Sequence, residues 1–300
     1  MKYVCLLAFT FFALGVSGQA RQKNEQITVD SISRRFVTYI PSIINTTDKF
    51  PLIISLHGRL GTGRGMIGFA DFRSIAAREK FIVVCPDGIN RSWNDGRSTP
   101  AKKKGINDVK FIDQLITYIL KTYNGDANKV YVTGMSNGGF MASRLACELN
   151  NRIAALAVVG ASMDKDVDYH PDKPIPAMYI QGTKDPLVPF EGGDIKSVAG
   201  GAVYGHADIL KCWSEADHCD SKPVITNFPD GAHDGTSIIK EEFINPATGV
   251  KVVGYTVING GHTWPGGTQY LPKFLIGAVS HNLNACEVIW EFFKGYKLSD

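Results

Sequence analysis

A serine flanked by glycines is the first candidate for chemistry in this sequence. Ser136 lies in the stretch VTGMSNGG, where Gly134 and Gly138 complete the pattern G-x-S-x-G. The apolar run before it predicts a strand and the run after it predicts a helix. Small neighbours at such a junction let a serine hydroxyl project from a sharp turn. The pattern alone is weak, but its position between a strand and a helix favours a nucleophile.

A serine hydroxyl needs a base to take its proton and a third group to orient that base. Asp185 follows the apolar run MYIQG, and His262 follows the run YTVIN in the stretch NGGHTWPGG. Both therefore lie where predicted strands end, and the carboxyl ends of parallel strands meet at one edge of a sheet. The order of Ser136, Asp185 and His262 along the chain predicts a catalytic triad for acyl transfer.

Acyl transfer also needs backbone N–H groups for the oxyanion. Asn137 follows the nucleophile, and Arg59 follows the strand PLIISLHG, so we expect their amides to form the oxyanion hole, with Leu60 as the alternative to Arg59. We interpret the His57 side chain as a structural hydrogen-bonding group. The other histidines lie in polar stretches or before the last helix, and we expect surface or capping roles for them: His170, His206, His218, His233 and His281.

Two tryptophans are candidates for substrate binding. Trp93 and Trp264 are expected to wall the acyl pocket or to stack on sugar or phenolic rings, and the alternative for both is packing in the core. Glycines 63, 65 and 68 form a literal G-x-G-x-x-G. They do not follow a strand directly, so a dinucleotide site is not expected. The sequence contains neither CxxC nor HExxH, and we expect no metal and no organic cofactor.

Strand-like apolar runs alternate with helical patterns along most of the chain, which predicts an α/β fold with a mostly parallel central sheet and helices on both faces. The runs IAALAVVGA and IPAMYIQG are separated only by residues 162–174, which leaves no room for a large cap domain. Residues 190–242 are the least regular part, and we expect a long excursion beside the site.

The composition is that of an ordinary globular protein: 300 residues, 44% hydrophobic, 20% charged and a net charge of +3. This balance does not indicate a nucleic-acid or anionic-membrane partner. Residues 1–18 are typical of a secretory signal, so we expect one catalytic domain over residues 19–300, without a membrane span and located outside the cell or in a periplasm. The oligomeric state is left open.

Six cysteines are present, and Cys5 lies within the expected signal. The odd number that remains leaves at least one cysteine free in an oxidising compartment. Cys212 and Cys219 are the candidate disulfide by proximity. The others are expected to be small buried apolar residues: Cys85, Cys147 and Cys286.

In these motifs the chain resembles the secreted esterases grouped as feruloyl esterase and polyhydroxybutyrate depolymerase-like α/β-hydrolases, which overlap carbohydrate esterase family one. The resemblance covers nearly all of the mature chain, including PLIISLHG, PDGINRSWND, KVYVTGMSNGGFMASRLACE, GTKDPLVP and GGHTWPGG. It implies an α/β-hydrolase fold, the triad Ser136, Asp185 and His262, and no cofactor. After LHG the depolymerase-like members tend to carry Cys and Gln, whereas this chain has Arg59 and Leu60.

We therefore expect a secreted serine carboxylic-ester hydrolase that acts on a polymer. Feruloyl or acetyl esters of plant cell-wall polysaccharide are the first choice of substrate, and polyhydroxybutyrate is the alternative. A non-catalytic polymer-binding relic of the same fold is the remaining hypothesis, and the complete triad argues against it.

Overall fold

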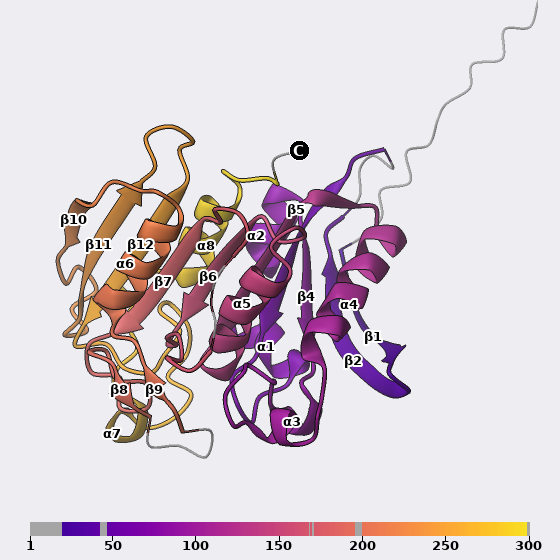
Figure 1. The fold of residues 1–300 in the computed structure, drawn as a ribbon, viewed down its shortest axis with the longest axis horizontal. Helices are drawn as coiled ribbons and strands as arrows, with labels where there is room; N and C mark the ends of the chain where they lie inside the picture. Colours follow the sequence, from indigo (N-terminus) through magenta and orange to yellow (C-terminus); the bar gives the residue numbers. More distant parts are fainter. Residues whose placement is uncertain (1–19, 43–46, 168, 170, 196–199, 299–300) are drawn as a thin grey trace, which may run out of the picture.

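The computed structural model describes residues 20–42, 47–167, 169, 171–195 and 200–298 (Figure 1). The expected signal segment, residues 1–18, lies outside them. One ten-stranded sheet runs through the described part of the chain, in the order β1-β2-β4-β3-β5-β6-β7-β12-β11-β10. Its strands are β1 (Arg21–Val29), β2 (Ile32–Ile40), β3 (Phe50–Leu56), β4 (Ile82–Pro86), β5 (Gly125–Met135), β6 (Ala155–Val159), β7 (Ala177–Gly182), β10 (Val224–Phe228), β11 (Ser237–Ile244) and β12 (Lys251–Ile258).

The middle of the sheet is parallel and its edges are antiparallel. Strands β4, β3, β5, β6, β7 and β12 run in one direction. Antiparallel pairing adds β2 and β1 at one edge and β11 and β10 at the other. The predicted mostly parallel sheet is confirmed. Its parallel strands read as apolar runs because helices cover both of their faces.

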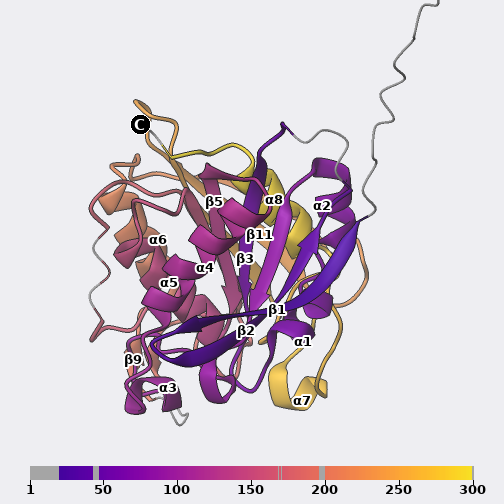
Figure 2. The same cartoon turned by 90° about the vertical axis from the view of Figure 1, so that its right-hand side faces the viewer.

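The helices of the described residues are α1 (Gly63–Phe69), α2 (Arg73–Glu79), α3 (Pro100–Lys103), α4 (Asp108–Thr122), α5 (Asn137–Glu148), α6 (His206–Ala216), α7 (Lys273–Ile276) and α8 (Ala285–Phe293). Figure 2 shows α4, α5 and α6 on one side of the sheet and α1, α2 and α8 on the other. Alternate residues of each strand enter different cores. In β3, Leu52 and Ile54 pack in the core with α4 and α5, while Ile53 packs in the core with α1, α2 and α8.

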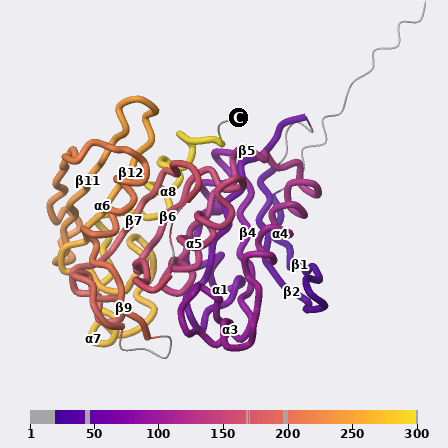
Figure 3. Tube along the Cα trace, in the orientation of Figure 1, coloured from indigo at the N-terminus to yellow at the C-terminus, as the bar shows by residue number. Residues whose placement is uncertain are grey.

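The predicted absence of a cap is confirmed, because the described residues between β6 and β7 form no helix or extended strand pair. The prediction for residues 190–242 is wrong. This segment contains a two-stranded ribbon, β8 (Gly193–Asp194) and β9 (Ala202–Val203), then α6, β10 and the start of β11 (Figure 1). Figure 3 shows the trace of α6 and β11 next to β12. Helix α6 buries Ile209, Leu210 and Trp213. Polar residues between these positions obscured the helical period in the sequence.

The expected pairing of Cys212 with Cys219 is not formed in the structure, where both are free thiols. Cys212 lies on α6, whereas Cys219 lies beyond its end, and its sulfur contacts the Val250 carbonyl at 3.8 Å. Within the described ranges, no helix is long and apolar enough to cross a membrane.

Candidate active site

Ser136 occupies the sharp turn between β5 and α5. Its backbone angles are φ 54° and ψ −125°, a conformation that a residue with a side chain adopts only under constraint. A Cβ atom on Gly134 would lie 2.3 Å from the Gly138 carbonyl oxygen, and one on Gly138 would lie 2.3 Å from the Leu56 carbonyl oxygen. Both flanking positions therefore require glycine, because strand and helix pass too close for any side chain.

The structure joins two of the three predicted catalytic side chains. Nδ1 of His262 lies 2.8 Å from Oδ2 of Asp185, and both side chains are buried. The other carboxylate oxygen, Oδ1, accepts the N–H groups of Leu187 (2.8 Å) and Val188 (2.9 Å). Because a carboxylate only accepts, the hydrogen of the neutral imidazole lies on Nδ1. Nε2 of His262 is left with a lone pair and can act as a base.

The end of β6 lies between the serine turn and this pair. The Ser136 amide donates to the Val159 carbonyl (3.0 Å), and a Cβ atom on Gly160 would lie 3.4 Å from Nδ1 of His262. Among the described residues, the Ser136 hydroxyl makes no hydrogen bond to His262, and catalytic hydrogen bonds are often long before a substrate binds. The three side chains thus gather at the carboxyl ends of β5, β7 and β12.

The loop that carries His262 is fixed by close backbone packing. The His262 amide donates to the Ile276 carbonyl at 2.6 Å, and the Tyr270 hydroxyl donates to the His262 carbonyl at 3.0 Å. A Cβ atom on Gly261 would lie 2.1 Å from the Ile276 oxygen. Glycine at this position therefore lets the loop pack directly on the segment at the end of α7.

The loop after β3 carries the two candidates for the first oxyanion amide, Arg59 and Leu60. The Leu60 amide donates to the Arg91 carbonyl at 2.8 Å, so the alternative that used Leu60 as the oxyanion donor is wrong. The Arg91 guanidinium in turn donates to the Leu60 carbonyl. The amides of Arg59 and Asn137 have no hydrogen-bond partner among the described residues. They are the donors that remain available to an oxyanion.

His57 supports this loop, as predicted. Its Nε2 accepts the Gly88 amide at 3.0 Å, and its Nδ1 lies 2.7 Å from the Gly58 carbonyl. These partners assign the hydrogen to Nδ1, because Nε2 must accept. Burial lowers the pKa of His57, which keeps the ring neutral at neutral pH.

The expectation that Trp93 and Trp264 line the substrate site is wrong, because both side chains are fully buried. Trp93 donates its indole N–H to the His57 carbonyl at 2.9 Å. The Trp264 ring packs edge-on against Phe69 and Phe72, with both pairs of ring centroids 6.3 Å apart. Both tryptophans support the site from beneath and have no exposed face for a substrate.

A buried network that the sequence reasoning missed holds the Asn137 side chain. Oδ1 of Asn137 accepts the Trp93 amide at 2.8 Å, and Nδ2 donates to Asp95 at 2.7 Å. Asp95 is paired with Arg97 at 2.5 Å, and that guanidinium stacks 3.5 Å above the Phe140 ring. The sequence signal for this network is the run WNDGR, which places an amide, a carboxylate and a guanidinium close after a buried strand. The Asn137 side chain is therefore fully engaged, and its backbone N–H is left without a partner among the described residues.

One predicted surface histidine is buried. His206 is 2% exposed, stacks on Phe190 at 5.1 Å and leaves both ring nitrogens without a partner among the described residues. Burial lowers its pKa to about 4.

Among the residues that the structure describes, no three His, Cys, Asp or Glu side chains gather as metal ligands would.

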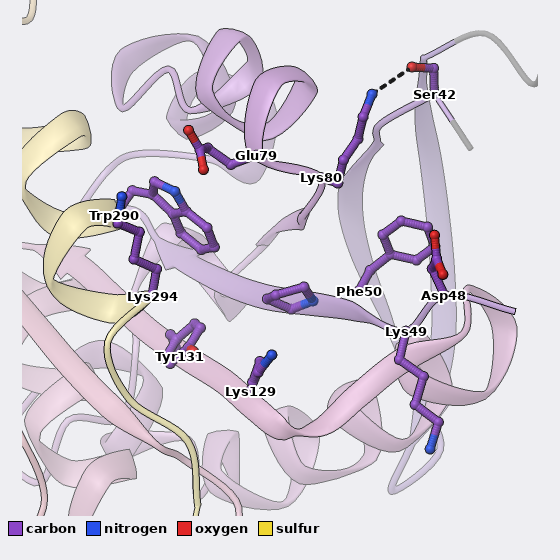
Figure 4. A pocket seen from close by; sticks show the side chains of 11 residues that line it. Ser42, Asp48, Lys49, Phe50, Glu79, Lys80, Lys129, Tyr131, Trp290 and Lys294 are labelled. Carbon is purple, nitrogen blue, oxygen red and sulfur yellow. Dashed lines mark hydrogen bonds between the residues drawn. The ribbon is translucent and has the colours of Figure 1, made fainter. Parts of the chain in front are cut away.

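A pocket of about 360 Å³ lies away from this site (Figure 4). It borders the amino end of β3 at Phe50 and the end of α8 at Lys294. Lys80 and Ser42 both line this pocket, and the Lys80 ammonium donates to the Ser42 hydroxyl at 3.1 Å. Ser136, Asp185 and His262 lie instead at the carboxyl ends of their strands, so this pocket is separate from the candidate active site.

Comparisons with known proteins agree with this architecture. Residues 45–223 match the dienelactone hydrolase family. The putative esterase NocK of Nocardia uniformis subsp. tsuyamanensis is 29% identical over 255 residues, which are 82% of this chain and 74% of that protein. Probable feruloyl esterase C of Aspergillus niger is 27% identical over 227 residues, 71% of this chain and 81% of the relative.

Two further similarities bear on length and fold. Feruloyl esterase B of Piromyces equi is 27% identical over 239 residues, which are 76% of this chain but only 42% of the relative. Among solved structures, an acetyl xylan esterase from Aspergillus awamori superposes with a TM-score of 0.55 at 17% identity, over 80% of this chain and 94% of that chain. At this identity the likeness shows the fold, which is that of the α/β-hydrolases.

Proposed function

Because the chain belongs to the dienelactone hydrolase family and has the α/β-hydrolase fold of esterases, we propose that it is a serine carboxylic-ester hydrolase in which Ser136, Asp185 and His262 carry the reaction. The observation that supports this proposal most directly is the 2.8 Å contact between Asp185 and His262 beside the constrained Ser136 turn. A buried carboxylate that fixes the imidazole tautomer leaves Nε2 as the base.

The proposed reaction has two halves. Nε2 of His262 takes the proton of Ser136 as the oxygen attacks the ester carbonyl, and the amides of Arg59 and Asn137 stabilise the oxyanion. His262 then gives the proton to the leaving alcohol. Water, activated by His262, releases the acyl group from Ser136 in the second half. Asp185 holds the ring and stabilises the imidazolium that forms in each half.

The proposed substrates are ester groups carried by a polymer, with feruloyl or acetyl esters of plant cell-wall polysaccharide first. Two relatives are named feruloyl esterases, and the solved neighbour is an acetyl xylan esterase. The short connection between β6 and β7 also supports an approachable site, because it carries no helical cap. Secretion remains part of the proposal and depends on residues 1–18 acting as a signal.

The test is hydrolysis of p-nitrophenyl acetate by purified wild-type protein, Ser136→Ala and the control Ser33→Ala, which removes an exposed hydroxyl on β2. We expect Ser136→Ala to lose at least about a thousandfold in kcat, and Ser33→Ala to keep wild-type activity. Equal rates for Ser136→Ala and wild type would remove the proposed mechanism. An inactive, folded wild type would support the non-catalytic relic.

A panel of polymer substrates then tests which polymer carries the ester that the protein hydrolyses. Release of ferulate or acetate from arabinoxylan supports the polysaccharide assignment, whereas release of 3-hydroxybutyrate from polyhydroxybutyrate alone supports the polyester alternative.

Secretion is tested by expressing the full chain in a secreting host and sequencing the amino terminus of the exported protein. We expect the exported protein to begin at Gln19. A full-length chain that stays inside the cell with residues 1–18 attached would contradict the predicted signal.

A further inference from the structure

Exposed large apolar side chains gather on the segments that carry the candidate catalytic groups. Among the described residues, Leu60 follows the oxyanion amide and is 59% exposed, and Leu187 follows Asp185 and is 48% exposed. Four more lie on the segment after His262, where Phe274 is 84% exposed. These four are Tyr270, Leu271, Phe274 and Leu275.

The residues directly after Leu275, from Ile276 to Ala278, contact both catalytic loops. The Gly261 amide donates to the Ala278 carbonyl at 2.9 Å, and the His262 amide donates to Ile276 at 2.6 Å. A Cβ atom on Gly277 would lie 3.2 Å from the carbonyl oxygen of Lys184, the residue before Asp185. The apolar side chains of the segment that precedes Ile276 are therefore held at the edge of the site.

Tyr270 connects this segment to the buried packing below. Its hydroxyl donates to the His262 carbonyl, and its ring packs edge-on against Phe69 with centroids 5.4 Å apart. Burial, together with the Asp185 charge, raises the pKa of Tyr270 to about 12. The phenol is therefore neutral at neutral pH and keeps the proton that it donates to the His262 carbonyl, while Tyr270 remains 40% exposed.

The chemistry of the proposed reaction says which part of the substrate lies here. His262 must deliver its proton to the leaving oxygen, so the alcohol part of the ester lies on the His262 side of the serine. The carbonyl oxygen of the ester lies on the other side of the serine, between the amides of Arg59 and Asn137. A surface built on the His262 loop therefore contacts the alcohol and not the oxyanion.

We propose that the α7 collar, defined as Leu187, Tyr270, Leu271, Phe274 and Leu275, binds the alcohol part of the substrate, which is the carbohydrate chain that carries the ester. The proposal rests on the proposed function. Sugar rings present apolar C–H faces that pack on exposed aromatic rings, and Tyr270 and Phe274 offer such rings. The collar thus selects esters by the alcohol they are attached to.

The experiment compares two substrates with one acyl group: methyl ferulate and a feruloylated arabino-oligosaccharide. The measured quantity is the ratio of kcat/KM for the oligosaccharide ester to kcat/KM for the methyl ester. We expect Phe274→Ala to lower this ratio about tenfold, mainly through KM on the oligosaccharide, and Phe274→Trp to retain it. Phe228→Ala, which removes an exposed ring from β10, is the matched control and should leave the ratio unchanged.

An unchanged ratio in Phe274→Ala would overturn the proposal, whether both kcat/KM values stay at the wild-type level or fall by the same factor. If the wild type releases acetate but no ferulate, acetylated xylo-oligosaccharide and methyl acetate replace the pair. Failure of the proposed function is seen separately, in the wild type: it would hydrolyse no ester, or it would do so without dependence on Ser136. A wild type active only on polyhydroxybutyrate would contradict the carbohydrate assignment.

Discussion

Nδ1 of His57 lies 2.7 Å from the Gly58 carbonyl oxygen, and that carbonyl belongs to the peptide bond whose N–H is the amide of Arg59. A trans peptide directs its C=O and N–H in opposite directions. A ring that holds the Gly58 oxygen on one side therefore aims the Arg59 N–H to the other. The Gly61 amide reinforces this orientation by donating to the same oxygen at 2.9 Å.

This relationship predicts that His57 acts on the reaction through the orientation of Arg59. We expect His57→Gln, whose amide lacks the donor at the Nδ1 position, to lower kcat about 10- to 100-fold. His57→Asn can place an N–H where Nδ1 was and should retain more of kcat. The measurement is steady-state hydrolysis of p-nitrophenyl acetate, with circular dichroism as the folding control. A change in KM alone, or equal kcat values in the two variants, would argue against this role.

Asp185 offers a second prediction, because its two carboxylate oxygens have different partners. Oδ1 accepts the amides of Leu187 and Val188, and only Oδ2 contacts His262. An asparagine with its carbonyl at Oδ1 preserves the loop but presents an N–H to His262, which favours the wrong tautomer. We therefore expect Asp185→Asn to fold normally and to lose about 10³- to 10⁴-fold in kcat. Wild-type kcat in a folded Asp185→Asn protein would exclude Asp185 from the triad.

Buried His206 predicts a loss of stability in acid. Its pKa in the folded protein is about 4, below the ordinary value of 6.5. As the pH falls from about 6.5 to about 4, the unfolded chain takes up a proton that the folded protein excludes, so the free energy of unfolding decreases. Between pH 7 and pH 4.5, His206→Leu should show a smaller decrease, by about 2 kcal/mol. Urea unfolding at pH 7 and pH 4.5 measures it, and identical pH dependence in both proteins would refute it.

Buried Asp217 predicts the opposite dependence on pH. Burial raises its pKa to about 7, although Oδ1 accepts the Ile175 amide at 2.9 Å. Between about pH 4 and pH 7 the unfolded chain is ionised at this position while the folded protein keeps the proton. The stabilising effect present below pH 4 is therefore lost as the pH rises through 7. Asp217→Asn cannot ionise, so its melting temperature should fall less than that of the wild type between pH 5 and pH 8.

The correct and incorrect sequence predictions differ in how local their causes are. The turn at Ser136, with glycines at positions 134 and 138, depends on residues within a few positions of the serine. The burial of Trp264 depends on Phe69 and Phe72, which lie almost two hundred positions earlier in the chain and pack against its ring. Burial of this kind has no signature in the residues next to the tryptophan.

Local sequence patterns were enough to locate the parallel strands and to place Ser136, Asp185 and His262 each after one of them, because apolar periodicity and glycine turns are local properties. Contacts between distant segments occupy the Leu60 amide while leaving that of Arg59 free of a partner among the described residues, bury His206, and leave Cys212 and Cys219 as free thiols. The fold also places Ile276, at the end of α7, beside His262. Each of these outcomes depends on which distant segments pack together, and that depends on the free energy of the whole core.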